Sequence, residues 1–180
     1  TKATNWEEWA RSMSTGGITG TNFVYADKTG RIAYIYNALF PDRKPGFDYT
    51  KVLPGDISAP VWTGPVSFDR YPKVVSPASG FVQNANNTPF LAAGPGSEID
   101  PASQSPYLGI ELGMTNRGLM GTGLMMNDSS ITPEELLAIK MDTRYAKSSW
   151  VKSWMDSLLA VDTKGDAKLG EAQKLLREWD

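Results

Sequence analysis

Hydrophobic and polar positions in the first part of the chain alternate in two different ways. Residues 5–13 place Trp6 and Trp9 on one face with charged residues elsewhere, which predicts an amphipathic helix. The runs 22–27 and 31–36 are rich in β-branched and aromatic residues and are separated by a short connection that contains glycine. This pattern is typical of a β-hairpin. We therefore expect a helix followed by a hairpin.

A long proline-rich segment follows, from residue 37 to about residue 78. Proline cannot occupy helix interiors or central strands, so this segment is predicted to consist of turns and short edge segments. We expect Trp62, Phe68 and Tyr71 to anchor it to the core. The prolines fall at positions 41, 45, 54, 60, 65, 72 and 77.

Helical patterns dominate the last third of the chain. Thr132, with Pro at the next position and Glu135 three residues later, predicts a capped helix start. Residues 149–159 and 166–179 repeat apolar side chains at helical spacing, which we interpret as packing faces. A weaker helical pattern begins near Thr115, where three glycines lower helix propensity.

Taken in order, these elements predict an α+β fold. The length of 180 residues fits one domain or a fragment of one. We divide it into a helix, hairpin and proline-rich part (1–90), a loop segment (91–128) and a helical part (129–180).

Composition removes several classes of function. The net charge of −2 gives no basic surface for nucleic acid, and no apolar run approaches the roughly 20 residues that span a membrane. Without Cys or His, the chain cannot build a thiol nucleophile, a thiolate zinc site or a Ser-His-Asp triad. Glu98 and Asp100 are oxygen donors in a loop, but two such acids are usually only solvated, so we expect no metal and no cofactor.

Carboxamides cluster in the segment 83–87, which reads Gln-Asn-Ala-Asn-Asn and is followed by Thr-Pro. One interpretation is a polar turn locked by side-chain hydrogen bonds to the backbone. The other is that an Asn directs its amide into a cleft, where an uncharged donor on a stiff loop stabilises a developing oxyanion. Spacing alone does not choose between them.

An ordered series of short segments adds a second kind of information. The series consists of residues 5–9, Tyr-Ala-Asp at 25–27 with Gly-Arg-Ile-Ala-Tyr at 30–34, Pro-Asp-Arg at 41–43, Leu-Pro-Gly at 53–55, Trp-Thr-Gly at 62–64, Phe-Asp at 68–69, Pro-Lys-Val at 72–74, the segment 80–89 and Thr-Asn-Arg at 115–117. In this order it resembles an internal part of the β-chain of the penicillin acylase family. These are N-terminal-nucleophile amidohydrolases, which include the acyl-homoserine lactone and aculeacin-type acylases.

The resemblance implies part of an αββα-type hydrolase fold and a specific chemistry. The family's nucleophile is the first residue of the mature β-chain, and its own α-amino group acts as the base, so no His is needed. The first Asn of the Asn-Asn pair, Asn86 here, implies an oxyanion donor. Arg117 matches an arginine that helps to position the nucleophile, although an ordinary salt bridge is an alternative role for it.

The chain also departs from the family pattern. Thr1 lies directly before the helix, where the family has interior chain, so we do not expect it to be the nucleophile. Ser76 stands where the family commonly has Asn. The glycines at positions 121 and 123 and the two methionines that follow stand where a regular helix is expected, which puts the geometry around Arg117 in doubt.

We therefore expect an amidohydrolase part that needs other segments. The resemblance implies as partners the β-chain segment with the nucleophile and an α-chain, and as substrate a penicillin-type β-lactam, an acyl-homoserine lactone or an acyl peptide. No nucleic acid or membrane is expected, and a periplasmic or secreted location follows from the resemblance alone. The alternatives are an isolated or redesigned non-catalytic domain and, on exposed Trp and Asn alone, a carbohydrate-binding module.

Overall fold

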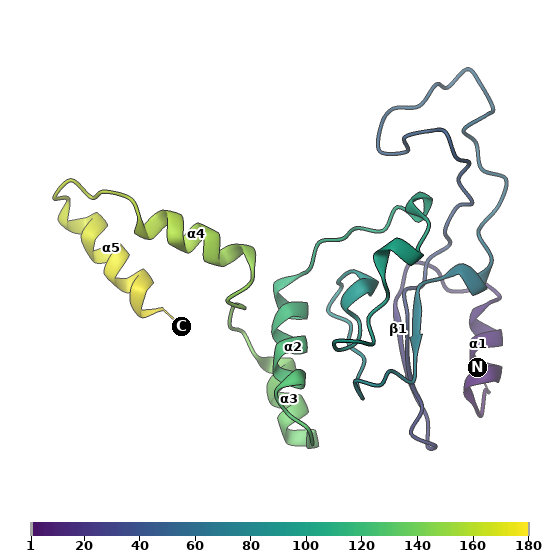
Figure 1. The fold of residues 1–180 in the computed structure, drawn as a ribbon, viewed down its shortest axis with the longest axis horizontal. Helices are drawn as coiled ribbons and strands as arrows, with labels where there is room; N and C mark the ends of the chain where they lie inside the picture. The colour runs from purple at the N-terminus through teal and green to yellow at the C-terminus, as the bar shows by residue number, and fades with distance from the viewer. Residues whose placement is uncertain (1, 180) are drawn as a thin grey trace. The chain divides into compact units, whose positions relative to one another are not determined.

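The computed structural model describes residues 2–179 (Figure 1). It divides into two compact units, one ending at Gly113 and one beginning at Met114, and each is described by itself. Together they contain helices and a small antiparallel sheet, which confirms the α+β fold. The three-part division predicted from the sequence stays a prediction. No helix among the described residues is both long and apolar enough to cross a bilayer.

The first unit is built on a three-stranded antiparallel sheet in the order β1-β2-β3. Strands β1 (Phe23–Ala26) and β2 (Ile32–Ile35) form the predicted hairpin, with Phe23 opposite Ile35. Strand β3 (Lys73–Val75) pairs with the other edge of β2. Because β2 is central, three of its four residues, Ala33, Tyr34 and Ile35, are completely buried.

Helix α1 (Trp6–Met13) lies beside this sheet (Figure 1). Asn5 caps it by accepting a hydrogen bond from the backbone N–H of Glu8 at 2.9 Å. The ring of Trp6 lies 5.2 Å from that of Tyr25, and the ring of Trp9 lies 5.8 Å from that of Phe23. The predicted aromatic face therefore packs against β1.

The proline-rich segment forms turns, a short 3-10 helix, η1 (Phe68–Arg70), and the edge strand β3. Tyr71 is only 8% exposed and belongs to the core, and Phe68 packs against that core as expected. The expectation that Trp62 is a third anchor is wrong, since 49% of it is exposed. It lines a shallow hollow together with Leu39, Pro41 and Pro65.

Three further 3-10 turns complete the first unit: η2 (Pro89–Leu91), η3 (Pro101–Ser103) and η4 (Pro106–Leu108). Its core contains Ile35, Phe40, Val66, Tyr71 and Leu108. Residues from the hairpin, the proline-rich segment and η4 meet there. This shared core holds the long irregular segments in place.

The second unit contains four helices, α2 (Asn116–Met126), α3 (Pro133–Met141), α4 (Trp150–Leu159) and α5 (Ala167–Glu178). Thr132 and Glu135 form the predicted capping box at the start of α3. Helix α2 is continuous despite its glycines, so the expected irregularity is absent. Its start is fixed by the Thr115 side chain, which accepts from the backbone N–H of Gly118 at 3.1 Å.

The expectation that α4 and α5 bury their apolar faces is wrong for the described chain. Trp150 and Trp154 are 61% and 65% exposed, and Leu175 is 63% exposed. Helices α3, α4 and α5 contain no buried residue. The helical period was read correctly, but a face is buried only where another element covers it.

Candidate functional site

The carboxamide loop lies in the first unit and is tied at both ends. The backbone N–H of Gln83 donates to the Ala92 carbonyl at 2.8 Å, and its side-chain amide donates to the Leu91 carbonyl at 2.7 Å. Val82 and Ala93 form an antiparallel bridge next to them. These contacts hold the two ends of the loop together.

Two asparagine side chains lock the interior of this loop. The Asn87 carboxamide accepts from the backbone N–H of Ala85 at 2.8 Å and donates to the Thr88 carbonyl at 2.7 Å. Asn87 is only 4% exposed. The side-chain oxygen (Oδ1) of Asn84 accepts from the backbone N–H of Asn86 at 3.2 Å. The expected polar turn is thus present, with Asn84 and Asn87 as its locking residues.

Asn86 differs from these two neighbours. It is exposed and has a φ of +55°, a backbone conformation that Asn adopts more readily than most residues. Its backbone N–H donates to the side chain of Asn84, and the next residue, Asn87, is buried and hydrogen-bonded. The backbone is therefore held on both sides of Asn86. The oxyanion role predicted for Asn86 from the resemblance stays a prediction.

Hydrogen bonds between the segments before and after the loop support its base. The N–H of Gly94 donates to the Ser79 hydroxyl at 3.0 Å, and the N–H of Ser79 donates to the Ser97 hydroxyl at 3.0 Å. Phe81 packs against the same glycine. The Pro-Ala-Ser-Gly turn thereby holds the segment that leads into the carboxamides.

Arg117 lies in the second unit, so Asn86 and Arg117 are described in separate units. It is exposed and occupies the second position of α2. The adjacent Asn116 fixes this helix start, because its amide donates to the Arg144 carbonyl at 3.1 Å and accepts from the Ala146 N–H at 2.8 Å. The backbone under Arg117 is thus held from two directions.

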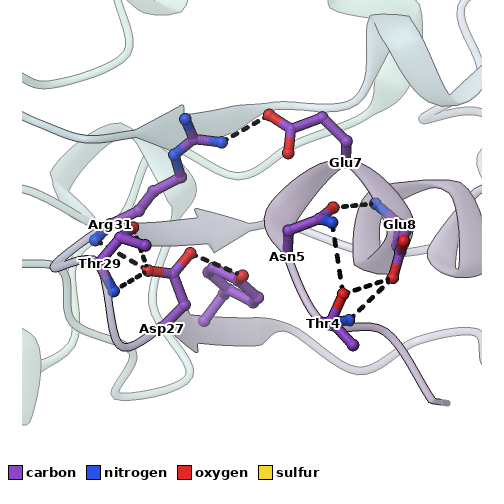
Figure 2. A network of polar contacts seen from close by, with 8 residues as sticks. Thr4, Asn5, Glu7, Glu8, Asp27, Thr29 and Arg31 are labelled. Carbon is purple, nitrogen blue, oxygen red and sulfur yellow. Dashed lines mark hydrogen bonds and ion pairs between the residues drawn. The ribbon is translucent and has the colours of Figure 1, made fainter.

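A polar network at the hairpin was not anticipated (Figure 2). Asp27 accepts from the hydroxyl of Thr29 at 2.5 Å, from the hydroxyl of Tyr25 at 2.9 Å and from backbone N–H groups. These bonds, led by that of Thr29, lower the pKa of Asp27 to about 2. Arg31 donates to Glu7 on α1 at 2.6 Å. The signal in the sequence was Asp-Lys-Thr-Gly, a turn sequence in which the acid bonds its own backbone.

Next to the carboxamide loop is a hollow of about 510 Å³. Thr88, the residue after Asn87, lines it together with Glu98 and Asp100. Apolar side chains provide most of the remaining wall, among them Phe90, Leu91 and Ile99. Within residues 2–179, no group of three or more acidic, His or Cys side chains is arranged to hold a metal ion. From the sequence we interpreted these two acids as solvated loop residues rather than metal ligands, and did not predict the hollow.

Comparison with known proteins now decides the family. A family model described as penicillin amidase matches residues 1–180. The chain belongs to the penicillin amidase family. Over 88 residues, 49% of this chain, it is 39% identical to penicillin G acylase of Escherichia coli, and this stretch is 10% of that protein.

A solved structure agrees with the fold of this penicillin amidase chain. The thermostable penicillin G acylase from Alcaligenes faecalis matches 99% of the chain with a TM-score of 0.66 and 24% identity. The chain covers 30% of that protein's chain. It therefore corresponds in length to a minor part of both relatives.

Proposed function

We propose that this chain is part of an amidohydrolase that cleaves the acyl amide of a small molecule through an acyl-enzyme. Asn86 supplies the side-chain N–H that stabilises the tetrahedral oxyanion. The observation that carries this role is the locked loop, in which Asn84 and Asn87 fix the backbone around an exposed Asn86. A donor held in advance does not reorganise as charge develops, and one such donor contributes about 2.7–4 kcal/mol in acyl transfer.

The nucleophile comes from another segment. The chain has neither Cys nor His, and Thr1 lies outside the described residues. An N-terminal Ser, Thr or Cys with its own free α-amino group as base requires no His. Arg117 acts as a positioning residue that orients the nucleophile by hydrogen bonding, and the hydrogen bonds of the adjacent Asn116, which fix the start of α2, support this role.

The partners are the nucleophile-bearing β segment and an α-chain. The exposed apolar faces of α4 and α5 support this proposal, because soluble proteins seldom leave contiguous apolar surface uncovered. The substrate is a penicillin-type β-lactam, an acyl-homoserine lactone or an acyl peptide. The compartment is the periplasm or the exterior of the cell.

The decisive experiment replaces Asn86 with glycine in the assembled enzyme that contains this chain. Glycine tolerates the φ of +55° and removes only the side-chain donor. We expect kcat on a panel of acylated p-nitroanilides to fall about 10²- to 10³-fold. The matched control is Lys164→Gly, which replaces another exposed residue at positive φ, 49°, and should leave kcat unchanged.

Full activity in Asn86→Gly contradicts the oxyanion role. An intact-mass spectrum under denaturing conditions tests the partner proposal separately, because a second chain that starts with Ser, Thr or Cys is expected. The alternative is an isolated or redesigned non-catalytic domain that acts as a structural or binding module, which the absence of Cys and His favours. A single species of 19.7 kDa without amidase activity supports that alternative.

A further inference from the structure

A hydrogen bond between residues 62 positions apart links the hairpin to the carboxamide loop. The side-chain amide (Nδ2) of Asn22 donates to the side-chain oxygen (Oδ1) of Asn84 at 3.2 Å. The same oxygen accepts the backbone N–H of Asn86, also at 3.2 Å. A carboxamide oxygen has two lone pairs, so it can accept both bonds at once. Asn84 therefore connects Asn22 to the backbone of the proposed oxyanion donor.

Asn22 is the fixed end of this connection. It is half-buried and lies directly before β1, where Phe23 pairs with Ile35 of β2. The Phe23 ring also packs against that of Trp9 on α1, with the ring centres 5.8 Å apart. Asn84, by contrast, is exposed, and the side chains of exposed residues change rotamer readily. The bond from Asn22 restricts this motion.

The other hydrogen bonds described for the carboxamide loop stay within residues 79–97. They include the bonds that the side chains of Gln83 and Asn87 make to nearby backbone groups. Such bonds fix the internal shape of the loop. The bond between Asn22 and Asn84 adds a constraint of a different kind, because it holds the loop to the end of the sheet where β1 begins.

We propose that Asn22 is a positioning residue for amide hydrolysis, which acts through Asn84 to hold Asn86. The Asx turn from Asn84 to Asn86 fixes the backbone, at a φ of +55°, from which the Asn86 side chain projects. An oxyanion donor is most effective when it is held in place before charge develops. Without the bond from Asn22, Asn84 spends part of its time in other rotamers and the donor is less well held. This inference rests on the proposed function, since it concerns the oxyanion donor of the same reaction.

Steady-state kinetics of Asn22→Ala in the assembled enzyme that contains this chain tests this role. We expect kcat per active site on acylated p-nitroanilides to fall about 3- to 10-fold, which corresponds to the loss of one ordinary hydrogen bond. KM should stay within about twofold of the wild-type value, because the oxyanion develops only toward the transition state.

A second background separates positioning from a general loss of structure. In an Asn86→Gly enzyme the donor is already absent, so Asn22→Ala should cause no further fall in kcat. A general loss of structure would lower kcat by the same factor in both backgrounds. The matched control is Asn5→Ala, which removes the asparagine that caps α1 in the same unit and should leave kcat unchanged. In the full chain, Asn22→Ala should shift the NMR signal of the Asn86 backbone amide.

The outcomes separate this inference from the proposed function. An unchanged kcat in Asn22→Ala, an equal fall in both backgrounds or an unmoved Asn86 amide signal overturns the positioning role. If Asn86→Gly lowers kcat and Asn22→Ala does not, the oxyanion role stands and only the positioning role fails. If Asn86→Gly retains full kcat, the oxyanion role fails and this inference fails with it, even where the amide signal shifts.

Discussion

The backbone N–H of Gly94 donates to the hydroxyl of Ser79 at 3.0 Å, and there is no room for a side chain at Gly94. A Cβ atom there would lie 2.8 Å from the Ser79 Cβ and 2.9 Å from the Phe81 ring. This contact brings together the segment that enters the carboxamide loop and the segment that leaves it. The geometry of the candidate site thus depends on a glycine outside the motif itself.

Gly94→Ala should lower the free energy of unfolding by about 1–3 kcal/mol, because the added methyl group must displace packed atoms. Chemical denaturation of the chain measures this change. The matched control is Gly55→Ala, where no atom lies within 4 Å, and it should change stability by less than about 1 kcal/mol. Equal effects at the two positions would show that the close contact is unimportant.

The hairpin network predicts a dependence of stability on pH. The Thr29 hydroxyl and the other donors hold the pKa of Asp27 at about 2, below its ordinary value of 3.8. A carboxyl whose pKa is lower in the folded state stabilises the fold above its unfolded pKa, and this contribution is lost as the pH falls toward the folded pKa. Wild type should therefore exceed Asp27→Asn in stability near neutral pH, and the difference should shrink between about pH 4 and pH 2.

Urea denaturation at a series of pH values checks this expectation. Asp56→Asn is the control, because Asp56 is an exposed loop carboxyl outside the network. Its curve should run parallel to that of the wild type. A gap between wild type and Asp27→Asn that stays constant down to pH 2 would rule out the network as its source.

Ser76, which stands where the resemblance to the family leads us to expect Asn, has an unusual backbone conformation. It is exposed and has a φ of +50°, a conformation in which Asn is more favourable than Ser. We expect Ser76→Asn to raise the free energy of unfolding by a few tenths to about 1 kcal/mol. Ser58→Asn, in an exposed turn without positive φ, should have no such effect. A melting temperature that rises equally in both variants would argue against the backbone explanation.

The sequence predicted the elements whose signals are local. The period of Trp6 and Trp9, the glycine of the hairpin and the Thr132 cap each lie within one turn or one connection of the structure that they specify. The pairing of Ala33 with Val75 joins residues 42 positions apart, and no local pattern encodes that register.

The candidate site follows the same rule. The carboxamide loop was recognisable because Asn residues bond their own backbone over short distances. The hollow beside it was not, since Thr88, Glu98 and Leu112 come together only through the folded turns. Trp62 was misjudged for a related reason, because the burial of an aromatic ring depends on elements that cover it.

The exposed tryptophans of α4 give the last prediction. Trp150 and Trp154 lie with ring centres 6.0 Å apart on the helix surface and are both more than half exposed. The chain on its own should therefore self-associate and bind a hydrophobic dye, and Trp150→Gln/Trp154→Gln should reduce both effects. Because neither ring is buried, the melting temperature should change by no more than about 2 °C. Lys152→Gln/Ser153→Gln on the same helix is the control, and light scattering with dye fluorescence is the measurement. A monomeric wild-type chain whose dye signal matches that of the tryptophan variant would mean that this face needs no partner.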